Sequence, residues 1–258
     1  MSHPQQDQHH DDGPPPVREA ATILLVRPVE APERPGLEVL TLTRSSQLVF
    51  SAGATAFPGG RIEASDPTPE YAAVRETFEE TGVLMAVRSD GTPGDLDFSE
   101  IPDDAQGLIE EDAERFEPFL EDLGLVADVA SMHQLSRWIT PEDQPRRYDT
   151  RFFLAAVPAG QQPRQLSFES VSWQWLTPAQ ALSDFRSGHR FLMPPTWAQL
   201  RVLAQALTVD QALHLPGQDQ PVTPRSLGGS PRRIVDFPDH EVYAEDLEQF
   251  HQHRPRPA

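Results

Sequence analysis

The chain contains no cysteine, so it has neither disulfide bonds nor thiolate chemistry, and redox usage does not indicate a compartment. No stretch approaches the roughly 18 consecutive apolar residues that a membrane-spanning helix requires. The N-terminus lacks the basic region and apolar core of a secretory signal. We therefore expect a cytoplasmic protein with no membrane partner.

Basic residues are scarce as well. The sequence has 40 Asp and Glu against 21 Lys and Arg, which gives a formal net charge of −19. Because nucleic acids are held by clustered cations, this balance argues against a nucleic-acid partner. An acidic protein can still act on a phosphate ester if metal ions neutralise the reacting group.

The 258 residues, 38% of them apolar, suffice for one sizeable domain diluted by 27 prolines. Residues 1–19 are polar and without an apolar period, so we expect a disordered tail. Residues 20–207 are predicted to form the domain. Residues 208–258 are a Pro/Gly-rich extension, partly ordered, in which residues 234–237 are expected to dock as a strand.

Alternating and β-branched residues predict strands at 21–26, 37–43, 135–139 and 148–155, the first two as a hairpin, with a short strand inside 50–57. Helices are expected at 69–81, 178–186 and 195–207. The acidic segment of about 88–130 lacks strand character and is predicted to be a helical insertion. It is either part of the substrate pocket, a solvated lid or a dimer contact, so a homodimer is left open.

The most informative segment runs from Phe57 to Val83 and joins a Pro-Gly-Gly turn to a short helix. Gly59 and Gly60 lack side chains, so their backbone can closely approach a metal or a phosphate. Thr68 is the expected N-cap and Pro69 the first helical residue. Gly82 is the expected C-terminal stop.

Three acids crowd this helix. Glu76 and Glu80 share a face, and Glu79 lies beside both. Their repulsion could be relieved by raised pKa values, by the adjacent Arg75, or by a hard divalent cation. A solvated acidic face is the plain alternative. The neighbouring glycine turn favours the cation.

This segment resembles the signature of the Nudix hydrolases, Gly-x5-Glu-x7-Arg-Glu-U-x-Glu-Glu-x-Gly-U, where U is aliphatic. Residues 75–83 match except for Thr77 at the first aliphatic position. In the first half, Asp66 replaces the first Glu, and eight residues rather than seven separate it from Arg75.

The resemblance implies an α/β/α sandwich with a mixed sheet, the helical insertion following the signature helix. It also implies metal-dependent hydrolysis of a nucleoside diphosphate linked to another moiety. Glu76, Glu79, Glu80 and the Gly59 carbonyl would be ligands or water positioners for Mg²⁺ or Mn²⁺. Arg75 would orient a glutamate.

Further site residues are expected outside the signature. A later acid often serves such enzymes as base or additional ligand, and Glu169 is the candidate, with a solvent-facing glutamate as the alternative. Gly60, Arg61 and Arg151 are candidates for binding the phosphates of a small-molecule nucleotide substrate. For the arginines, an ordinary surface ion pair is the alternative.

The segment from Gly53 to Gly60 is similar to one preceding the signature in coenzyme A diphosphatases. Segments 138–141 and 148–153 look like the subgroup with a long central insertion, which includes acyl-CoA diphosphatases. Val49 departs from the coenzyme A motif, which has arginine there.

We expect cleavage of coenzyme A or acyl-CoA to 3′,5′-ADP and (acyl-)phosphopantetheine. NADH, ADP-ribose or a related nucleotide is the alternative substrate. A non-catalytic, nucleotide-sensing module is a second alternative, but such a module has no need for Arg75 and all three glutamates.

Overall fold

The computed structural model describes residues 14–29, 36–43, 54–90, 101–102, 104–164, 172–218, 220–227 and 234–254. The tail up to residue 13, Val49, Gly53 and Glu169 lie outside the described residues.

The described strands build one eight-stranded mixed sheet and two small two-stranded sheets. At the centre of the large sheet, β1 (Val17–Pro28) runs parallel to β8 (Arg147–Ala156) and antiparallel to β2 (Leu37–Thr43). The outer strands are β7 (His133–Ile139), β3 (Ala54–Ala56) and β10 (Phe191–Leu192). Two further strands pair off this path, β4 (Gly59–Arg61) with β1 and β9 (Ser172–Leu176) with β2.

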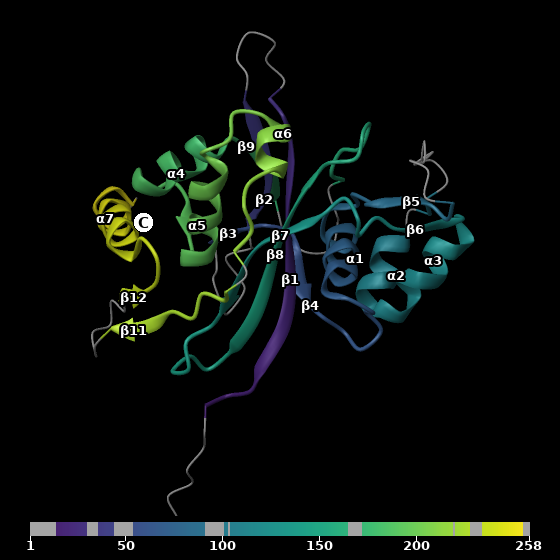
Figure 1. Cartoon of the computed structure of the whole chain (residues 1–258), viewed down its shortest axis with the longest axis horizontal. Helices are drawn as coiled ribbons and strands as arrows, with labels where there is room; N and C mark the ends of the chain where they lie inside the picture. The colour runs from purple at the N-terminus through teal and green to yellow at the C-terminus, as the bar shows by residue number, and fades with distance from the viewer. Residues whose placement is uncertain are drawn as a thin grey trace, which may run out of the picture.

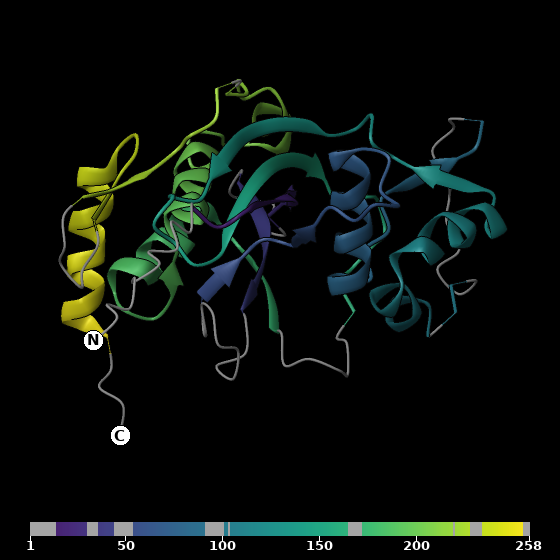
Figure 2. The ribbon, with the colours of Figure 1, turned by 90° about the horizontal axis from the view of Figure 1, so that it is seen from below.

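Helices cover both faces of this sheet (Figure 1). On one side lie α1 (Pro69–Thr81), α2 (Ala105–Glu111), the short 3₁₀ helix η2 (Ala113–Arg115) and α3 (Phe116–Asp122). On the other side lie α4 (Pro178–Arg186), α5 (Pro194–Leu203), α6 (Val209–Leu213) and α7 (His240–His253) (Figure 2). The predicted α/β/α sandwich is confirmed.

Strand β1 explains why there are two cores. Ile23 and Leu25 pack into the cluster that includes Phe78 of α1, whereas Leu24 and Val26 pack into the cluster that includes Trp197 of α5. Successive strand residues point to opposite faces, so an unbroken apolar run serves both layers. The central strand is therefore buried on both sides.

The predicted bounds of α1 are confirmed together with its caps. The Thr68 hydroxyl accepts a hydrogen bond from the Tyr71 N–H at 3.2 Å. Gly82 has φ 71°, in the left-handed region, and its N–H donates to the Phe78 carbonyl. The strand hairpin at residues 21–43, strands β7 and β8, and helix α4 also form where they were expected.

The insertion is helical, as predicted, but it is closed by strands that were not. β5 (Ala86–Arg88) pairs with β6 (Leu125–Ala127) in an antiparallel two-stranded sheet. Such short strands carry too few residues to establish a period in the sequence. Between them, α3 packs on α1 through Phe119, which stacks on Phe78 with ring centroids 5.1 Å apart.

The bounds of two elements differ from those expected. β1 begins at Val17, inside the expected tail, because Val17 pairs with Arg147 of β8. Helix α5 ends at Leu203 rather than Leu207.

The described residues after 207 contain more regular structure than the sequence predicts. The extension forms α6, β11 (Arg225–Leu227), β12 (Ile234–Asp236) and α7, of which only the strand at β12 was expected. Prolines interrupt the local period, but Tyr243 and Phe250 of α7 stack on Phe185 with centroids 5.7 and 5.5 Å apart. The buried Trp197 indole donates to Asp246 of α7 at 2.9 Å. Tertiary packing thus stabilises a helix that local sequence propensity does not predict.

None of the helices in the described ranges combines the length and apolar character needed to span a bilayer.

We predict that Phe250→Ala lowers the free energy of unfolding by about 3–5 kcal/mol, because it empties a site between Phe185 and Phe191. The matched control is Val242→Ala on the same helix, which is 36% exposed and is expected to change stability by about 0.5 kcal/mol or less. Urea denaturation measures both. Equal, small effects would show that α7 is not part of the core.

Candidate metal-binding and catalytic site

The glycine turn is built into the sheet beside the centre of the molecule. Gly59 pairs with Thr22 of β1 and Gly60 with Ala21. Gly59 has φ 150°, and a Cβ there would lie 2.4 Å from the Ala21 carbonyl oxygen. Only glycine allows β4 to approach β1 this closely.

Two glutamates of α1 close onto this turn. The Gly59 N–H donates to Oε2 of Glu80 at 2.9 Å. A Cβ on Gly60 would lie 2.3 Å from Oε2 of Glu76, so the Glu76 carboxylate occupies the space that a side chain would need. The two acids are one helical turn apart and reach successive residues of the loop.

Arg75 is the hub of the site and is only 2% exposed. Its Nε and Nη2 donate to Oδ1 and Oδ2 of Asp66 at 2.9 and 2.8 Å. Nη2 also donates to the Arg61 carbonyl at 2.9 Å. Nη1 donates to Oε1 of Glu79 at 2.7 Å and to Oε1 of Glu76 at 3.1 Å. One guanidinium thus connects the loop after β4 with two of the three glutamates.

Asp66 completes this arrangement, although no role was predicted for it. It is the bidentate partner of Arg75, and its Oδ2 also accepts the Glu63 N–H at 2.8 Å. The shorter acid and the loop with one extra residue therefore still deliver a carboxylate to the arginine. The signal was the presence of an acid at the signature position despite the changed residue and spacing.

Thr77, the departure at the aliphatic position, is fully buried. Its hydroxyl donates to the Ala73 carbonyl at 2.7 Å, which satisfies the polar group within the helix.

Burial and mutual repulsion raise the pKa values of two of the glutamates. Burial, followed by the charge of Glu76, raises the pKa of Glu79 to about 7 although Arg75 opposes the shift. Burial likewise raises the pKa of Glu76. For Arg75, burial lowers the pKa, but the hydrogen bond to Asp66 and the charges of Glu76 and Glu79 outweigh it and raise the pKa overall. The cluster holds more negative charge than a single arginine balances.

These residues fit a hard divalent cation by their chemistry. The donors are carboxylate and carbonyl oxygens, which Mg²⁺ and Mn²⁺ prefer. Arg75 holds only Oε1 of Glu76 and of Glu79, so Oε2 of each lies outside those contacts. Within the described ranges, no three histidine or acidic side chains are already spaced to hold an ion.

The other expected residues, Arg61 and Arg151, lie on two different strands. Arg61 is in β4, its side chain is 52% exposed, and it lies 3.7 Å from Glu63. Arg151 is in β8, opposite Ala21 of β1, and pairs with Glu19 at 3.1 Å. β1 therefore separates Arg151 from Gly60.

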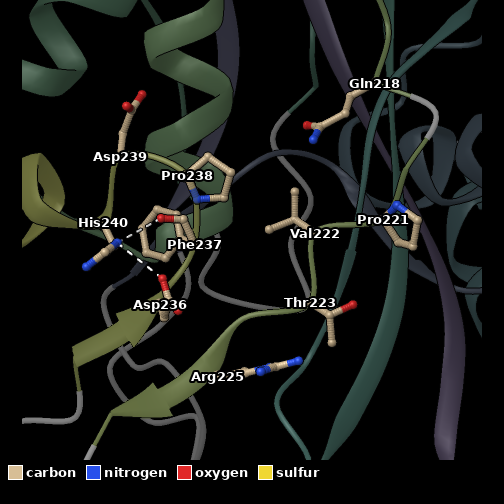
Figure 3. A pocket seen from close by; sticks show the side chains of 10 residues that line it. All are labelled: Gln218, Pro221, Val222, Thr223, Arg225, Asp236, Phe237, Pro238, Asp239 and His240. Carbon is tan, nitrogen blue, oxygen red and sulfur yellow. Dashed lines mark hydrogen bonds and ion pairs between the residues drawn. The ribbon is translucent and has the colours of Figure 1, made fainter.

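A separate hollow of about 540 Å³ lies at the C-terminal extension (Figure 3). Val222 and Phe237 line it, and both belong to the core cluster of α5, on the face opposite α1. His240 and Asp236 also line it and lie 3.4 Å apart. The hollow is thus distinct from the glutamate cluster.

Comparison with known proteins agrees with this geometry. The model of the NUDT19 Nudix domain matches residues 70–203, just over half of the chain, and that of the NUDIX domain matches residues 18–105. The protein named acyl-coenzyme A diphosphatase NUDT19 of Gallus gallus is 25% identical over 89% of this chain and 80% of its own length. Its namesake of Homo sapiens is 27% identical over 74% of this chain and 70% of its own length.

A solved structure supports the fold. The crystal structure of a NUDIX hydrolase from Alicyclobacillus acidocaldarius is 27% identical, superimposes with a TM-score of 0.69, and covers 78% of this chain and 97% of its own. Together with the family match to just over half of the residues, this shows that the chain belongs to the Nudix hydrolase family, in the branch of the NUDT19 Nudix domain.

Proposed function

We propose that the protein hydrolyses the pyrophosphate of coenzyme A or acyl-CoA, with Mg²⁺ or Mn²⁺, to 3′,5′-ADP and (acyl-)phosphopantetheine. Two relatives that align with most of the chain are named acyl-coenzyme A diphosphatases. The observation that carries the proposal is the buried Arg75 network, which gathers Glu76 and Glu79 beside the Gly59–Gly60 turn. A binding module would have no reason to bury such a cluster.

The cation would be held by Glu76, Glu79, Glu80 and the Gly59 carbonyl. When bound, it neutralises pyrophosphate oxygens and lowers the pKa of a water molecule toward neutrality. Arg75 holds the Glu79 carboxylate through a charge-assisted hydrogen bond at 2.7 Å. The Gly59 N–H fixes one oxygen of Glu80.

Glu169 is proposed as the base or additional ligand, and Gly60 and Arg61 as phosphate contacts. Gly60 has no side chain of its own and lies directly beside the Glu76 carboxylate, and Arg61 follows it on the same strand with a half-exposed guanidinium. Removing the charge of Arg61 would weaken substrate binding without affecting the metal.

We predict that Glu79→Gln and Glu80→Gln each reduce kcat by about 10³-fold, because each removes a charged oxygen donor needed in the transition state. Turnover is measured on coenzyme A, acyl-CoA, NADH and ADP-ribose with Mg²⁺ or Mn²⁺, with the products resolved by mass. Glu70→Gln in the first turn of α1 is the matched control and should retain full activity. Cleavage of NADH but not coenzyme A would favour the alternative substrate, and no cleavage of any compound would favour the sensing module.

We predict that Mn²⁺ binds the wild-type protein and that combining Glu76→Gln, Glu79→Gln and Glu80→Gln abolishes this binding, because the oxygens lose their charge. Isothermal titration calorimetry measures this without substrate. The Glu70→Gln protein again serves as the control. Unchanged Mn²⁺ affinity in the triple variant would contradict the ligand assignment even if activity were lost.

We predict that Asp66→Asn lowers the free energy of unfolding by about 3–5 kcal/mol, because it leaves Arg75 buried without its bidentate carboxylate. The control is Glu63→Gln, whose side chain is 42% exposed and whose ion pair with Arg61 spans 3.7 Å. It should cost about 1 kcal/mol or less. Equal denaturation midpoints for the two variants would show that Asp66 does not support the hub.

A further inference from the structure

Two arginines oppose each other on neighbouring strands. Arg137 of β7 is the direct cross-strand partner of Arg151 of β8. Such partners have Cβ atoms about 4.5–5.5 Å apart, and like charges in these positions are destabilising. Within the fold, each arginine has one acidic partner that offsets this repulsion, Asp149 for Arg137 and Glu19 for Arg151.

The pair lies in line with the glycine turn. Gly60 pairs with Ala21, Ala21 with Arg151, and Arg151 with Arg137, which makes three strand-to-strand steps of about 4.8 Å, or about 14 Å in all. Ala21 packs in the core cluster of α1. Residues paired across strands share a face, so both arginines project on the side of the sheet that carries Glu76.

The arginines keep donors for a ligand. Arg137 uses Nε and Nη2 for the two oxygens of Asp149, at 2.7 and 2.5 Å, and none of the hydrogen bonds among the described residues involves its Nη1. Arg151 makes a single ion pair with Glu19, which is 60% exposed. Such an exposed pair contributes about 0–1 kcal/mol, so a stronger anion can displace it.

Arg61 is assigned to the pyrophosphate above, whereas the side chains of Arg75 and Arg147 are committed to partners within the protein. Arg75 uses Nε, Nη1 and Nη2 within its own cluster. Arg147 is buried and donates to the carbonyls of Thr140 and Pro15. Arg137 and Arg151 are 32% and 21% exposed and thus remain accessible to a ligand.

We propose that Arg137 and Arg151 together bind a phosphomonoester of the substrate that is remote from the pyrophosphate being cleaved. In coenzyme A this group is the 3′-phosphate, so the inference rests on the proposed function. A phosphate dianion bridges two guanidinium groups through charge-assisted hydrogen bonds and removes their mutual repulsion. Asp149 positions Arg137, and Glu19 is the side chain that the phosphate displaces. The pair thereby distinguishes coenzyme A from nucleotides without a 3′-phosphate.

The test compares coenzyme A with 3′-dephospho-coenzyme A as substrates. Arg137→Gln and Arg151→Gln are each expected to lower kcat/KM for coenzyme A by about 10–100-fold, chiefly through KM. With the dephospho substrate the change should stay below about 3-fold, because the contact is not made. The control, Arg201→Gln, changes a 37% exposed arginine of α5 on the opposite face and should leave both substrates unaffected. Equal losses on both substrates would overturn the proposal.

A binding measurement separates this inference from the proposed function. Calorimetry with 3′,5′-ADP and 5′-AMP needs no turnover. Wild type should prefer 3′,5′-ADP, and Arg151→Gln, whose partner Glu19 is exposed so that the fold is spared, should abolish the preference. If wild type cleaves no coenzyme A but shows this preference, the proposed reaction is wrong and the phosphate site stands. If it cleaves coenzyme A without the preference, the phosphate site is wrong.

Discussion

Arg75 is only 2% exposed, so its charged guanidinium is removed from water. A buried charge is tolerated only where carboxylates and carbonyls form hydrogen bonds with it. The three guanidinium nitrogens of Arg75 engage Asp66, Glu76, Glu79 and the Arg61 carbonyl, which belong to the loop, the helix and strand β4. The loop, the helix and strand β4 must therefore be positioned so that Arg75 can make all these hydrogen bonds at once. The Arg75 guanidinium thus helps to position the carboxylates of Glu76 and Glu79, together with the helix that carries them.

The central strand β1 packs against both helical layers. One face of β1 packs with α1, and the other packs with α5 and the C-terminal extension. The Trp197–Asp246 hydrogen bond and the rings of α7 hold the second layer in place. β1 also pairs with β4 and β8, so the strand that both layers cover also borders the glycine turn and Arg151.

The sequence predicted those parts that depend on local chemistry. Capping residues located α1, alternation located the main strands, and helical spacing placed Glu76 and Glu80 on one face. It did not predict the Asp66–Arg75 pair, because that contact depends on the path of a proline-containing loop. It did not predict the opposition of Arg137 and Arg151, because strand register depends on distant residues. The order of α7 was missed for the same reason, since its aromatic partners lie in α4 and α5.

Charge explains why the site takes this form. All 21 basic residues are arginines, against 40 acids, so nearly every cation near the site already has an acidic neighbour. An anionic substrate therefore does not find a surface of unpaired arginines. To bind an arginine, it must displace the acidic side chain that already pairs with it. A divalent cation would neutralise the excess negative charge of the carboxylates at the glycine turn, and a phosphate would replace Glu19 at Arg151. Binding energy is then the difference between two sets of ion pairs, which makes selectivity depend on where the substrate carries its charges.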